Sequence, residues 1–480
     1  MTALPTLHVT ALQNLLSPAE VITDADTMAP FCLDQRRRYR GEVFAVLQPR
    51  SVAAVQAAMR YCHQHRIPVT PQGGNTGLCG GATPHASVAG RGIILSLGKL
   101  NRVRAFSRAD YSLTVDAGMV LADVQRVAAE NGCFFPLSLA SEGSCQIGGN
   151  IACNAGGLNV VRYGPARDLV LGLEVVLADG TLVDQLQPLH KNTSGYDLKH
   201  SMIGSEGTLG IITGATLKLF SPPQSVLTAW VGVDSIHAAA DLLAAVKNRF
   251  GERLSSFELV SAHALKLSAD YSNSALPLQA AWHVLLELTD SIVGAELTDP
   301  LAEVLDEHGW TEAVIALSES ERQQLWRLRE NISAAQKRIG TSIKHDIAVP
   351  IAAVADCVTD CEAALRQRFA EVETVVFGHL GDGSLHYNVF LPPLFDDAVY
   401  AYEDEVNALI YERTLALGGT IAAEHGIGQL KNHWLPRVRS EAELAWMRAG
   451  KQQLDPHGIL NAGKLLPENG THGFQAVPSK

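Results

Sequence analysis

Four side chains in the last quarter of the sequence are of the types that bind a divalent cation and move a proton. His379 and His386 lie seven residues apart, and Glu424 and His425 follow together in an Ala-Ala-Glu-His-Gly segment. Neutral imidazole and carboxylate are ligands of Zn²⁺, and a catalytic zinc site uses three protein ligands and leaves a position open for substrate. We predict a metal site of His379, His386 and Glu424, with His425 as a base at neutral pH. The alternative for His425 is that it only orients Glu424.

A predicted β-hairpin positions the two histidines. An apolar run at 375–377 leads into His379 and a Gly-Asp-Gly turn. An alternating run at 385–389 places His386 and Asn388 on the face opposite its apolar side chains. Histidines at this spacing also occur as two ordinary polar residues. The neighbouring glycines favour a site, because glycine lets backbone approach a ligand closely.

The composition is that of an ordinary globular protein of two or three domains, with 480 residues, 47% of them hydrophobic and 18% charged. A net charge of −12 gives no general attraction to nucleic acid or anionic lipid, so an anionic substrate must be bound by local Arg and Lys residues. The sequence contains no apolar stretch of membrane-spanning length, and residues 1–16 lack the pattern of a secretory signal. We expect a cytoplasmic protein whose eight cysteines are reduced thiols.

Hydrophobic periodicity predicts an α+β chain. A helix is expected after Ser51, whose side chain caps it, and Ser221-Pro222-Pro223 interrupts the chain because consecutive prolines end strand pairing. Expected strands before this break cover 67–70, 92–97, 112–117, 169–177 and 209–219. Beyond it, the pattern of an antiparallel sheet backed by helices gives strands at 226–233, 281–288 and 344–349 and helices at 235–250, at 319–339 and up to about 371.

Two glycine-rich stretches predict a backbone wrapped around an extended ligand. The first, residues 71–78, follows a strand and can turn its N–H groups toward a pyrophosphate. It lacks both the Rossmann glycine pattern and the lysine of a phosphate-loop NTPase, so neither class is supported, and a surface turn is the alternative. The second, residues 141–164, is so dense in Gly and Ala that structural turns alone explain it poorly.

A cationic cluster is expected on the helix and strand that precede the hairpin. Arg329 and Ser333 lie four residues apart on one predicted helix face, and Lys344 follows on the next strand. A guanidinium binds a carboxylate through two parallel hydrogen bonds, and Lys adds a mobile charge. These three side chains can form one anion pocket, whereas Arg327 is assigned to a solvated face.

Six sequence blocks occur in order over roughly 40–465: P-Q-G-G-N-T-G, I-G-G-N-x-A-x-N-A-G-G, G-Y-D-L, I-G-S-E-G-T-L-G-I-I, G-H-x-G-D-G-x-x-H and A-x-E-H-G-I-G. Together they resemble the FAD-linked oxidases of the vanillyl-alcohol-oxidase type, and within them the D-2-hydroxyacid dehydrogenases. The resemblance is strongest to the D-2-hydroxyglutarate dehydrogenase group, with the FAD-linked D-lactate dehydrogenases and the glycolate oxidase flavin subunits nearby. It implies a two-subdomain FAD-binding domain at 1–222, an antiparallel-sheet substrate domain at 223–415 and a C-terminal segment at 416–480 that completes the metal and FAD sites.

The resemblance also implies which residues hold the cofactor and the substrate. FAD binding is implied for residues of the glycine-rich stretches, the following strand and the C-terminal segment: Gly73, Gly74, Asn75, Thr76, Gly77, Gly143, Ser144, Gly149, Asn150, Ala155, Gly156, Gly157, Glu206, Ile211, Ile212 and Asn461. Without a histidine in the first loop, FAD is expected to be bound non-covalently. Arg329, Ser333, Lys344 and Asn388 match substrate-contacting positions, with Ser333 in place of the expected threonine.

The implied reaction is oxidation of D-2-hydroxyglutarate to 2-oxoglutarate, with hydride passing to the flavin and the hydroxyl proton to His425. Zn²⁺ or Mn²⁺ would polarise the hydroxyl. The implied partners are an electron-transfer flavoprotein or quinone-linked acceptor and a second copy in a homodimer. D-lactate, D-malate and glycolate are alternative substrates, and a metal-free flavin carrier or electron-transfer subunit is the hypothesis from another class. A non-enzymatic binding module is disfavoured because no expected metal ligand is missing.

Overall fold

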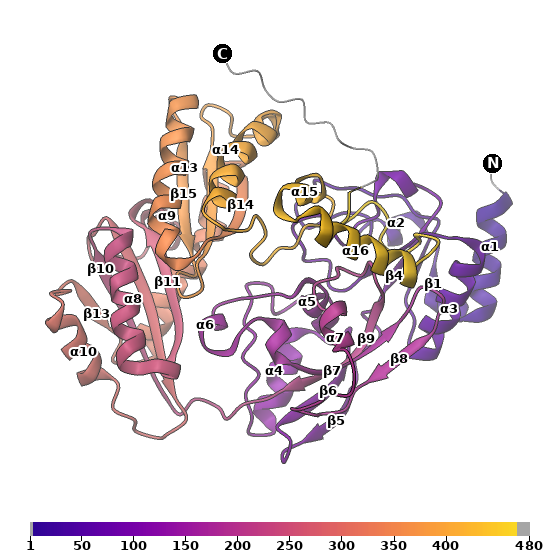
Figure 1. Cartoon of the computed structure of the whole chain (residues 1–480), viewed down its shortest axis with the longest axis horizontal. Helices are drawn as coiled ribbons and strands as arrows, with labels where there is room; N and C mark the ends of the chain where they lie inside the picture. Colours follow the sequence, from indigo (N-terminus) through magenta and orange to yellow (C-terminus); the bar gives the residue numbers. More distant parts are fainter. Residues whose placement is uncertain (1–2, 468–480) are drawn as a thin grey trace.

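The computed structural model describes residues 3–467. Figure 1 shows an N-terminal half built on two sheets beside a domain built on one large sheet. We refer to residues 225–416 as the sheet domain and to 417–467 as the C-terminal segment.

The first sheet of the N-terminal half has the strand order β1-β2-β4-β3, and β2, β4 and β3 run parallel. The predicted cap of α3 is confirmed, because the Ser51 side chain accepts a hydrogen bond from the Ala54 N–H. Helices α1 and α3 bury their apolar faces against this sheet. The element bounds are α1 Ala3–Leu15, β1 Val21–Ile22, α2 Ala25–Met28, β2 Ala45–Leu47, α3 Val52–His65, β3 Val69–Gln72 and β4 Ile93–Ser96.

The second sheet is antiparallel, in the order β5-β6-β9-β7-β8. Strand β9 joins the two cores, because Ile211 lies in the core of the first sheet and Ile212 in the core of the second. Successive side chains on a strand point to opposite faces, which explains the division. The bounds are β5 Val103–Ser107, β6 Ser112–Asp116, α4 Leu121–Glu130, α5 Ile147–Cys153, α6 Val160–Tyr163, β7 Val170–Val176, β8 Leu182–Gln185, α7 Leu198–Met202 and β9 Ile211–Lys218.

The sheet domain has seven strands in the order β13-β10-β12-β11-β15-β16-β14, all paired antiparallel. Helices α8, α10, α13 and α14 cover one face, and α9, α11 and α12 cover the other. The α+β fold predicted from the sequence is thereby confirmed. The bounds are β10 Ser225–Val233, α8 Ile236–Phe250, β11 Leu254–Ser261, α9 Ala262–Ser272, β12 Trp282–Asp290, α10 Thr298–Glu307, β13 Ala313–Ile315, α11 Glu319–Glu330, α12 Ile332–Ala335, β14 Ile343–Ala348, α13 Val354–Arg368, β15 Glu373–Gly378, β16 Ser384–Phe390, a 3₁₀ segment η7 Asp397–Tyr402 and α14 Glu403–Ala416.

Two of the differences between the sheet domain and the sequence prediction concern the site. The prediction of one continuous helix over 319–339 is wrong. Helix α11 ends at Glu330, and the short α12 begins at Ile332. Strand β11 was not predicted, although it lies at the centre of the sheet between β12 and β15. Both differences bear on the site, since α11 carries Arg329 and β11 carries Glu258.

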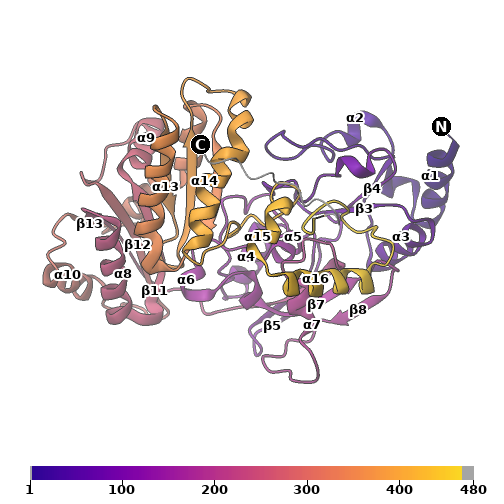
Figure 2. The same ribbon diagram turned by 45° about the horizontal axis from the view of Figure 1, so that its top comes forward.

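The C-terminal segment returns to the N-terminal half, where α15 (Leu435–Val438) and α16 (Glu441–Leu454) lie beside α5 and α7 (Figures 1 and 2). Leu460 pairs with Val69 and so covers the open edge of β3. Residues 468–480 of the predicted third domain lie outside the described residues. None of the helices within 3–467 has the length and apolar character that crossing a bilayer requires.

Candidate metal and flavin site

One face of the β14–β16 pair carries four polar side chains opposite one another. Asp346 pairs with His386 and Lys344 pairs with Asn388 in the antiparallel register. The alternate residues on β16 are buried in the main core of the sheet domain, as the hairpin prediction required. The polar four therefore lie on the opposite face, near the edge of the sheet that meets the C-terminal segment.

His379 stands in the turn between β15 and β16 and is held between two carboxylates. Its Nδ1 lies 2.6 Å from Oε1 of Glu258, and its Nε2 lies 3.0 Å from Oε1 of Glu424. Burial alone would lower the pKa of His379, but the charges and hydrogen bonds of Glu258 and Glu424 outweigh it and raise that pKa well above its ordinary value. A carboxylate on one imidazole nitrogen fixes the ring so that the other nitrogen faces a metal.

His379, His386 and Glu424 are brought together as predicted, with their ligand atoms within 4.8 Å of one another. Burial lowers the pKa of His386 to about 4, so this imidazole is neutral and has a lone pair to share. Burial opposes ionisation of Glu424, but the charge and hydrogen bond of His379 prevail and lower the pKa of Glu424. Two imidazoles and an ionised carboxylate form a donor set suited to a borderline divalent ion.

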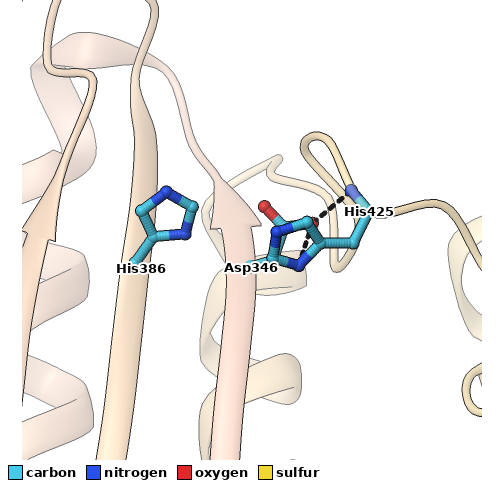
Figure 3. A group of neighbouring side chains, drawn as sticks. All are labelled: Asp346, His386 and His425. Atoms are coloured by element: carbon cyan, nitrogen blue, oxygen red, sulfur yellow. Dashed lines mark hydrogen bonds and ion pairs between the residues drawn. The ribbon is translucent and has the colours of Figure 1, made fainter. Parts of the chain in front are cut away.

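Asp346 organises the chain around His425 (Figure 3). Its Oδ2 accepts the backbone N–H groups of Glu424 at 3.1 Å and His425 at 2.8 Å, and lies 3.5 Å from Nδ1 of the His425 ring. Its Oδ1 is buried without a hydrogen-bond partner in the described chain and lies toward His386. Asp346, His386 and His425 form a second trio of donor atoms within 4.8 Å, so the two trios share His386.

The residues after His425 are fixed from the other side by Glu206 of the N-terminal half. Its carboxylate accepts the N–H groups of Ile427 and Gly428, both at 2.8 Å. A Cβ added to Gly428 would lie 2.1 Å from the carbonyl oxygen of Cys79, so the backbone at Cys79 leaves no room for a side chain at position 428. The segment 424–428 is thus clamped by one carboxylate from each half of the molecule.

The predicted anion-binding residues do not form one cluster on a single helix face. Arg329 is buried, and its Nε and Nη2 both bind Glu258, at 2.8 and 2.7 Å. Ser333 is exposed on α12, after the helix has broken, so it does not share a continuous helix face with Arg329. Lys344 and Asn388 face each other across β14 and β16, with Asn388 donating to Gln336 at 2.8 Å.

The two glycine-rich stretches meet in the N-terminal half. A Cβ added to Gly74 would lie 2.2 Å from the Ser144 carbonyl oxygen, and one on Gly73 would lie 3.7 Å from Cα of Gly149. Asn461 donates through its side chain to the carbonyl oxygens of Gly81 and Glu206, so the C-terminal segment reaches the same region. The remaining cofactor candidates lie after β3 (Asn75, Thr76, Gly77), before α5 (Gly143, Ser144), in and after α5 (Asn150, Ala155, Gly156, Gly157) and on β9 (Ile211, Ile212).

The glycine-rich chain passes close to Glu424, one of the metal candidates. A Cβ on Gly156 would lie 3.7 Å from Cγ of Glu424. A ligand extended along these glycines would therefore end beside His379, His386 and Glu424. A separate cavity of about 350 Å³ lies beside α11, lined among others by Ser138, Asn159 and Trp326, and none of the predicted site residues lines it.

Sequence reasoning missed Glu258 and Asp346. A signal for Glu258 was available, since a lone Glu inside the run Phe257–Val260 requires a buried partner. Asp346 follows His345 on a predicted strand, where alternation puts it on the polar face. Their partners lie 121 and 79 residues farther along the chain, which no local pattern reveals.

Comparison with known proteins identifies the class. The model for the C-terminal domain of FAD-linked oxidases matches residues 222–465, and that for an FAD-binding domain matches 44–185. The chain belongs to the FAD-linked oxidase family and is an FAD-dependent oxidoreductase. Within this family it is a homologue of the D-2-hydroxyglutarate dehydrogenases. The family predicted from the six sequence blocks is confirmed.

Individual relatives match over nearly the whole chain. The D-2-hydroxyglutarate dehydrogenase of Xanthomonas citri pv. viticola is 39% identical over 96% of this chain and 97% of its own length. The mitochondrial D-2-hydroxyglutarate dehydrogenase of Bos taurus is also 39% identical, over 95% of this chain and 83% of its own length. Among solved structures, p-cresol methylhydroxylase superposes with a TM-score of 0.78 at 15% identity, covering 96% of this chain and 97% of that one, which supports the fold alone.

Proposed function

We propose that this protein oxidises D-2-hydroxyglutarate to 2-oxoglutarate with FAD and a divalent metal ion. The observation that carries the proposal is the convergence of His379, His386 and Glu424, beside His425, on the end of the glycine-rich chain at Gly156. A hydroxy acid loses a proton from oxygen and a hydride from carbon, so its oxidation needs a base and an electron acceptor side by side. The choice of D-2-hydroxyglutarate as the substrate follows the names of the relatives, which are D-2-hydroxyglutarate dehydrogenases.

The glycine-rich chain fits FAD. Side chains added at Gly77, Gly143 and Gly149 would meet no protein atom within 4 Å, so space for a ligand lines this chain. Asn150 Oδ1 and Gln146 Oε1 are buried without hydrogen-bond partners among residues 3–467, as polar atoms that serve a cofactor would be. We propose that the sixteen residues named from the resemblance hold FAD, without a covalent bond. Bound FAD supplies the two-electron acceptor chemistry of this class.

The metal candidates fit Zn²⁺ or Mn²⁺. To bind the ion, Nε2 of His379 would release its proton to solvent, and Glu258 on Nδ1 keeps the ring aimed at Glu424. The other trio would take His425 as a ligand, so its imidazole could no longer accept the hydroxyl proton. We propose His379, His386 and Glu424 as the ligands. A bound divalent ion supplies Lewis-acid polarisation of the substrate hydroxyl.

His425 is the proposed base. Burial lowers its pKa, so the ring is neutral at physiological pH and can accept a proton. Its Nδ1 faces the Asp346 carboxylate, which leaves Nε2 as the atom that accepts the hydroxyl proton. Asp346 then stabilises the imidazolium that results, as the aspartate of a catalytic triad does.

Substrate carboxylates require cations, because the chain as a whole is acidic. Lys344 and Asn388 lie on the same strand pair and face as His386, and we propose that they contact the substrate. Arg329 supports the site through Glu258 in this conformation and is proposed to reach the substrate with its remaining Nη1. Ser333 stays a proposed contact from α12.

Anaerobic flavin reduction tests the proposal. D- and L-2-hydroxyglutarate, D-malate and D-lactate are each mixed with the oxidised holoenzyme, and flavin bleaching is followed. We expect D-2-hydroxyglutarate to react fastest and L-2-hydroxyglutarate to leave the flavin oxidised. Faster reduction by D-lactate would replace the proposal with a D-lactate dehydrogenase.

Metal removal gives a separate prediction. Dialysis against a chelator should remove the ion and slow flavin reduction by D-2-hydroxyglutarate about a thousandfold, because Lewis-acid stabilisation contributes several kcal/mol. Flavin absorbance should persist. Re-addition of Zn²⁺ or Mn²⁺ restores the rate and identifies the more effective ion. Full activity after verified metal removal would contradict a metal role.

Gly149→Ala separates cofactor binding from folding. Alanine is favoured over glycine inside a helix by about 1 kcal/mol, and the new methyl meets no protein atom within 4 Å, so the apoprotein should be at least as stable as wild type. Overpacking against bound FAD should weaken its affinity about tenfold or more. Gly450→Ala in α16, also free of contacts, is the matched control and should leave FAD affinity unchanged. Equal FAD affinities in the two variants would remove Gly149 from the proposed cofactor site.

The remaining expectations also belong to the proposal. We propose an electron-transfer flavoprotein or a quinone-linked acceptor as the oxidant of the reduced flavin, and a homodimer as the assembly. The named relatives come from bacteria and from mitochondria. The cytoplasmic location of this chain stays a prediction.

A further inference from the structure

The loop 79–83, which continues the first glycine-rich stretch, is built around one side chain of the C-terminal segment. Nε2 of Gln429 donates to the backbone carbonyl oxygens of Gly80 and Thr83, at 2.8 and 3.3 Å. Both partners are carbonyls, which only accept, so this end of the amide must be its nitrogen. A Cβ added to Gly80 would lie 2.7 Å from Nε2, and Gly80 has a φ of +68°, so the turn around the glutamine requires glycine.

The backbone beside Gln429 is bound to the same loop. The Cys79 carbonyl oxygen accepts the N–H groups of Gln429 at 3.0 Å and of Leu430 at 3.3 Å. The Cys79 thiol donates to the Gly426 carbonyl oxygen at 3.4 Å. These contacts begin one residue after His425, so the segment with the proposed base rests directly on the loop.

The base of the loop is closed by Gln72, the last residue of β3. Its Nε2 donates to the Ala82 carbonyl oxygen at 2.8 Å and to the Phe31 carbonyl oxygen at 2.9 Å. We refer to residues 73–77, proposed to hold FAD, as the nucleotide arm. The nucleotide arm and residues 79–82 are thus two parts of one closed loop, and ordering the first restricts the second through contiguous contacts.

We propose that Gln429 is a positioning residue that carries the ordering of the nucleotide arm to the segment with the proposed base. The inference rests on the proposed function, which puts FAD on the nucleotide arm, and Gln429 lies outside the sixteen residues proposed to hold FAD. Hydride and proton leave neighbouring atoms of one substrate, so their acceptors must be aligned to within about 0.5 Å. A link through Gln429 aligns His425 with the flavin when the cofactor binds.

Two other roles for these contacts lead to different results. If Gln429 only stabilises the turn, its loss lowers thermal stability whether or not a nucleotide is bound. If FAD itself fixes residues 424–430 by touching them, the isoalloxazine is required, because the glycine-rich chain passes close to Glu424 at Gly156. ADP separates these cases, since it has the pyrophosphate of FAD and lacks the part that would reach Glu424.

Hydrogen exchange of the full-length apoprotein, freed of FAD, tests the inference. Mass spectrometry follows the peptide that spans residues 424–431, whose N–H groups at 427–430 are hydrogen-bonded and report local opening when they exchange. We expect saturating ADP to slow this exchange about tenfold in wild type, a coupling of ordinary size between linked sites. Gln429→Met keeps the size of the side chain and loses its donor, so ADP should still bind but leave the exchange unchanged. Gln429→Lys, which can donate to both carbonyl oxygens, should restore part of the effect.

Gln453→Met is the matched control, because Gln453 is an exposed glutamine of α16 in the same segment and should leave the effect of ADP as in wild type. Three results would overturn the inference: no binding of ADP to the apoprotein, protection of the wild-type peptide by FAD but not by ADP, or equal protection by ADP in Gln429→Met and wild type. The comparison of ADP with FAD in wild type does not depend on the folding of any variant.

None of these measurements requires turnover. If ADP protects the peptide through Gln429 and no 2-hydroxy acid reduces the flavin of the holoenzyme, the proposed function fails and this inference stands. If D-2-hydroxyglutarate reduces the flavin and ADP leaves the wild-type peptide unprotected, the proposed function stands and this inference fails.

Discussion

Replacing His386 by alanine should abolish substrate oxidation while the protein keeps its flavin. His386 is the member shared by both trios of donor atoms, so its loss leaves no described set of three that could hold the ion. Lewis-acid polarisation contributes several kcal/mol, and we expect D-2-hydroxyglutarate to reduce the flavin about a thousandfold more slowly or not at all. Stopped-flow bleaching measures the rate, and elemental analysis measures the bound metal.

The control for this variant is His263→Ala. His263 is exposed on α9 and belongs to neither trio, so its replacement should change neither metal content nor rate. The FAD candidates lie in the N-terminal half and, for Asn461, in the C-terminal segment, and none lies on the sheet domain, so His386→Ala should purify with a full complement of flavin. A His386→Ala protein with undiminished metal and rate would eliminate the proposed metal site.

Local pattern was sufficient for the hairpin that carries the site. Strict alternation at Leu385, Tyr387 and Val389 predicts both the strand and the face that His386 occupies, because the period of a strand is two residues. The cap of α3 at Ser51 was predictable for the same reason: its signal lies within one helical turn. Such features depend on neighbours in sequence.

The support of the site depends on neighbours in space. Glu258 binds both His379 and Arg329, and this pairing turns a predicted substrate cation into part of a buried ionic network. Glu206 was predicted to bind FAD, and its carboxylate holds Ile427 and Gly428. Sequence spacing cannot reveal such contacts, which depend on how the two halves of the molecule meet.

The break between α11 and α12 has the same origin. Periodicity over 319–339 continues through Asn331, but the chain leaves the helix there. Arg329 thereby turns toward Glu258 on β11, a strand that the sequence did not predict, while Ser333 moves to the surface. A tertiary ion pair and helix packing override local propensity in this segment.

Replacing Asp346 by asparagine should slow the chemical step more than it weakens binding. The carboxylate fixes the backbone at Glu424 and His425 and faces the His425 ring, and an amide retains one oxygen acceptor but loses the charge that stabilises the imidazolium. Loss of such a supporting partner costs about tenfold to a hundredfold in activity. We therefore expect kcat to fall by this factor, with KM for D-2-hydroxyglutarate and the affinity for 2-oxoglutarate close to wild type.

A fall in kcat without a change in KM distinguishes a role of Asp346 in positioning the base from a folding defect of the variant. Asp360→Asn, at an exposed position on α13, is the matched control and should behave as wild type in every assay. A folding defect in Asp346→Asn would instead lower thermal stability, FAD content and ligand affinity together. If kcat is unchanged while these three fall, Asp346 supports the segment 424–428 but has no effect on His425, and the proton must then be accepted by a group that Asp346 does not orient.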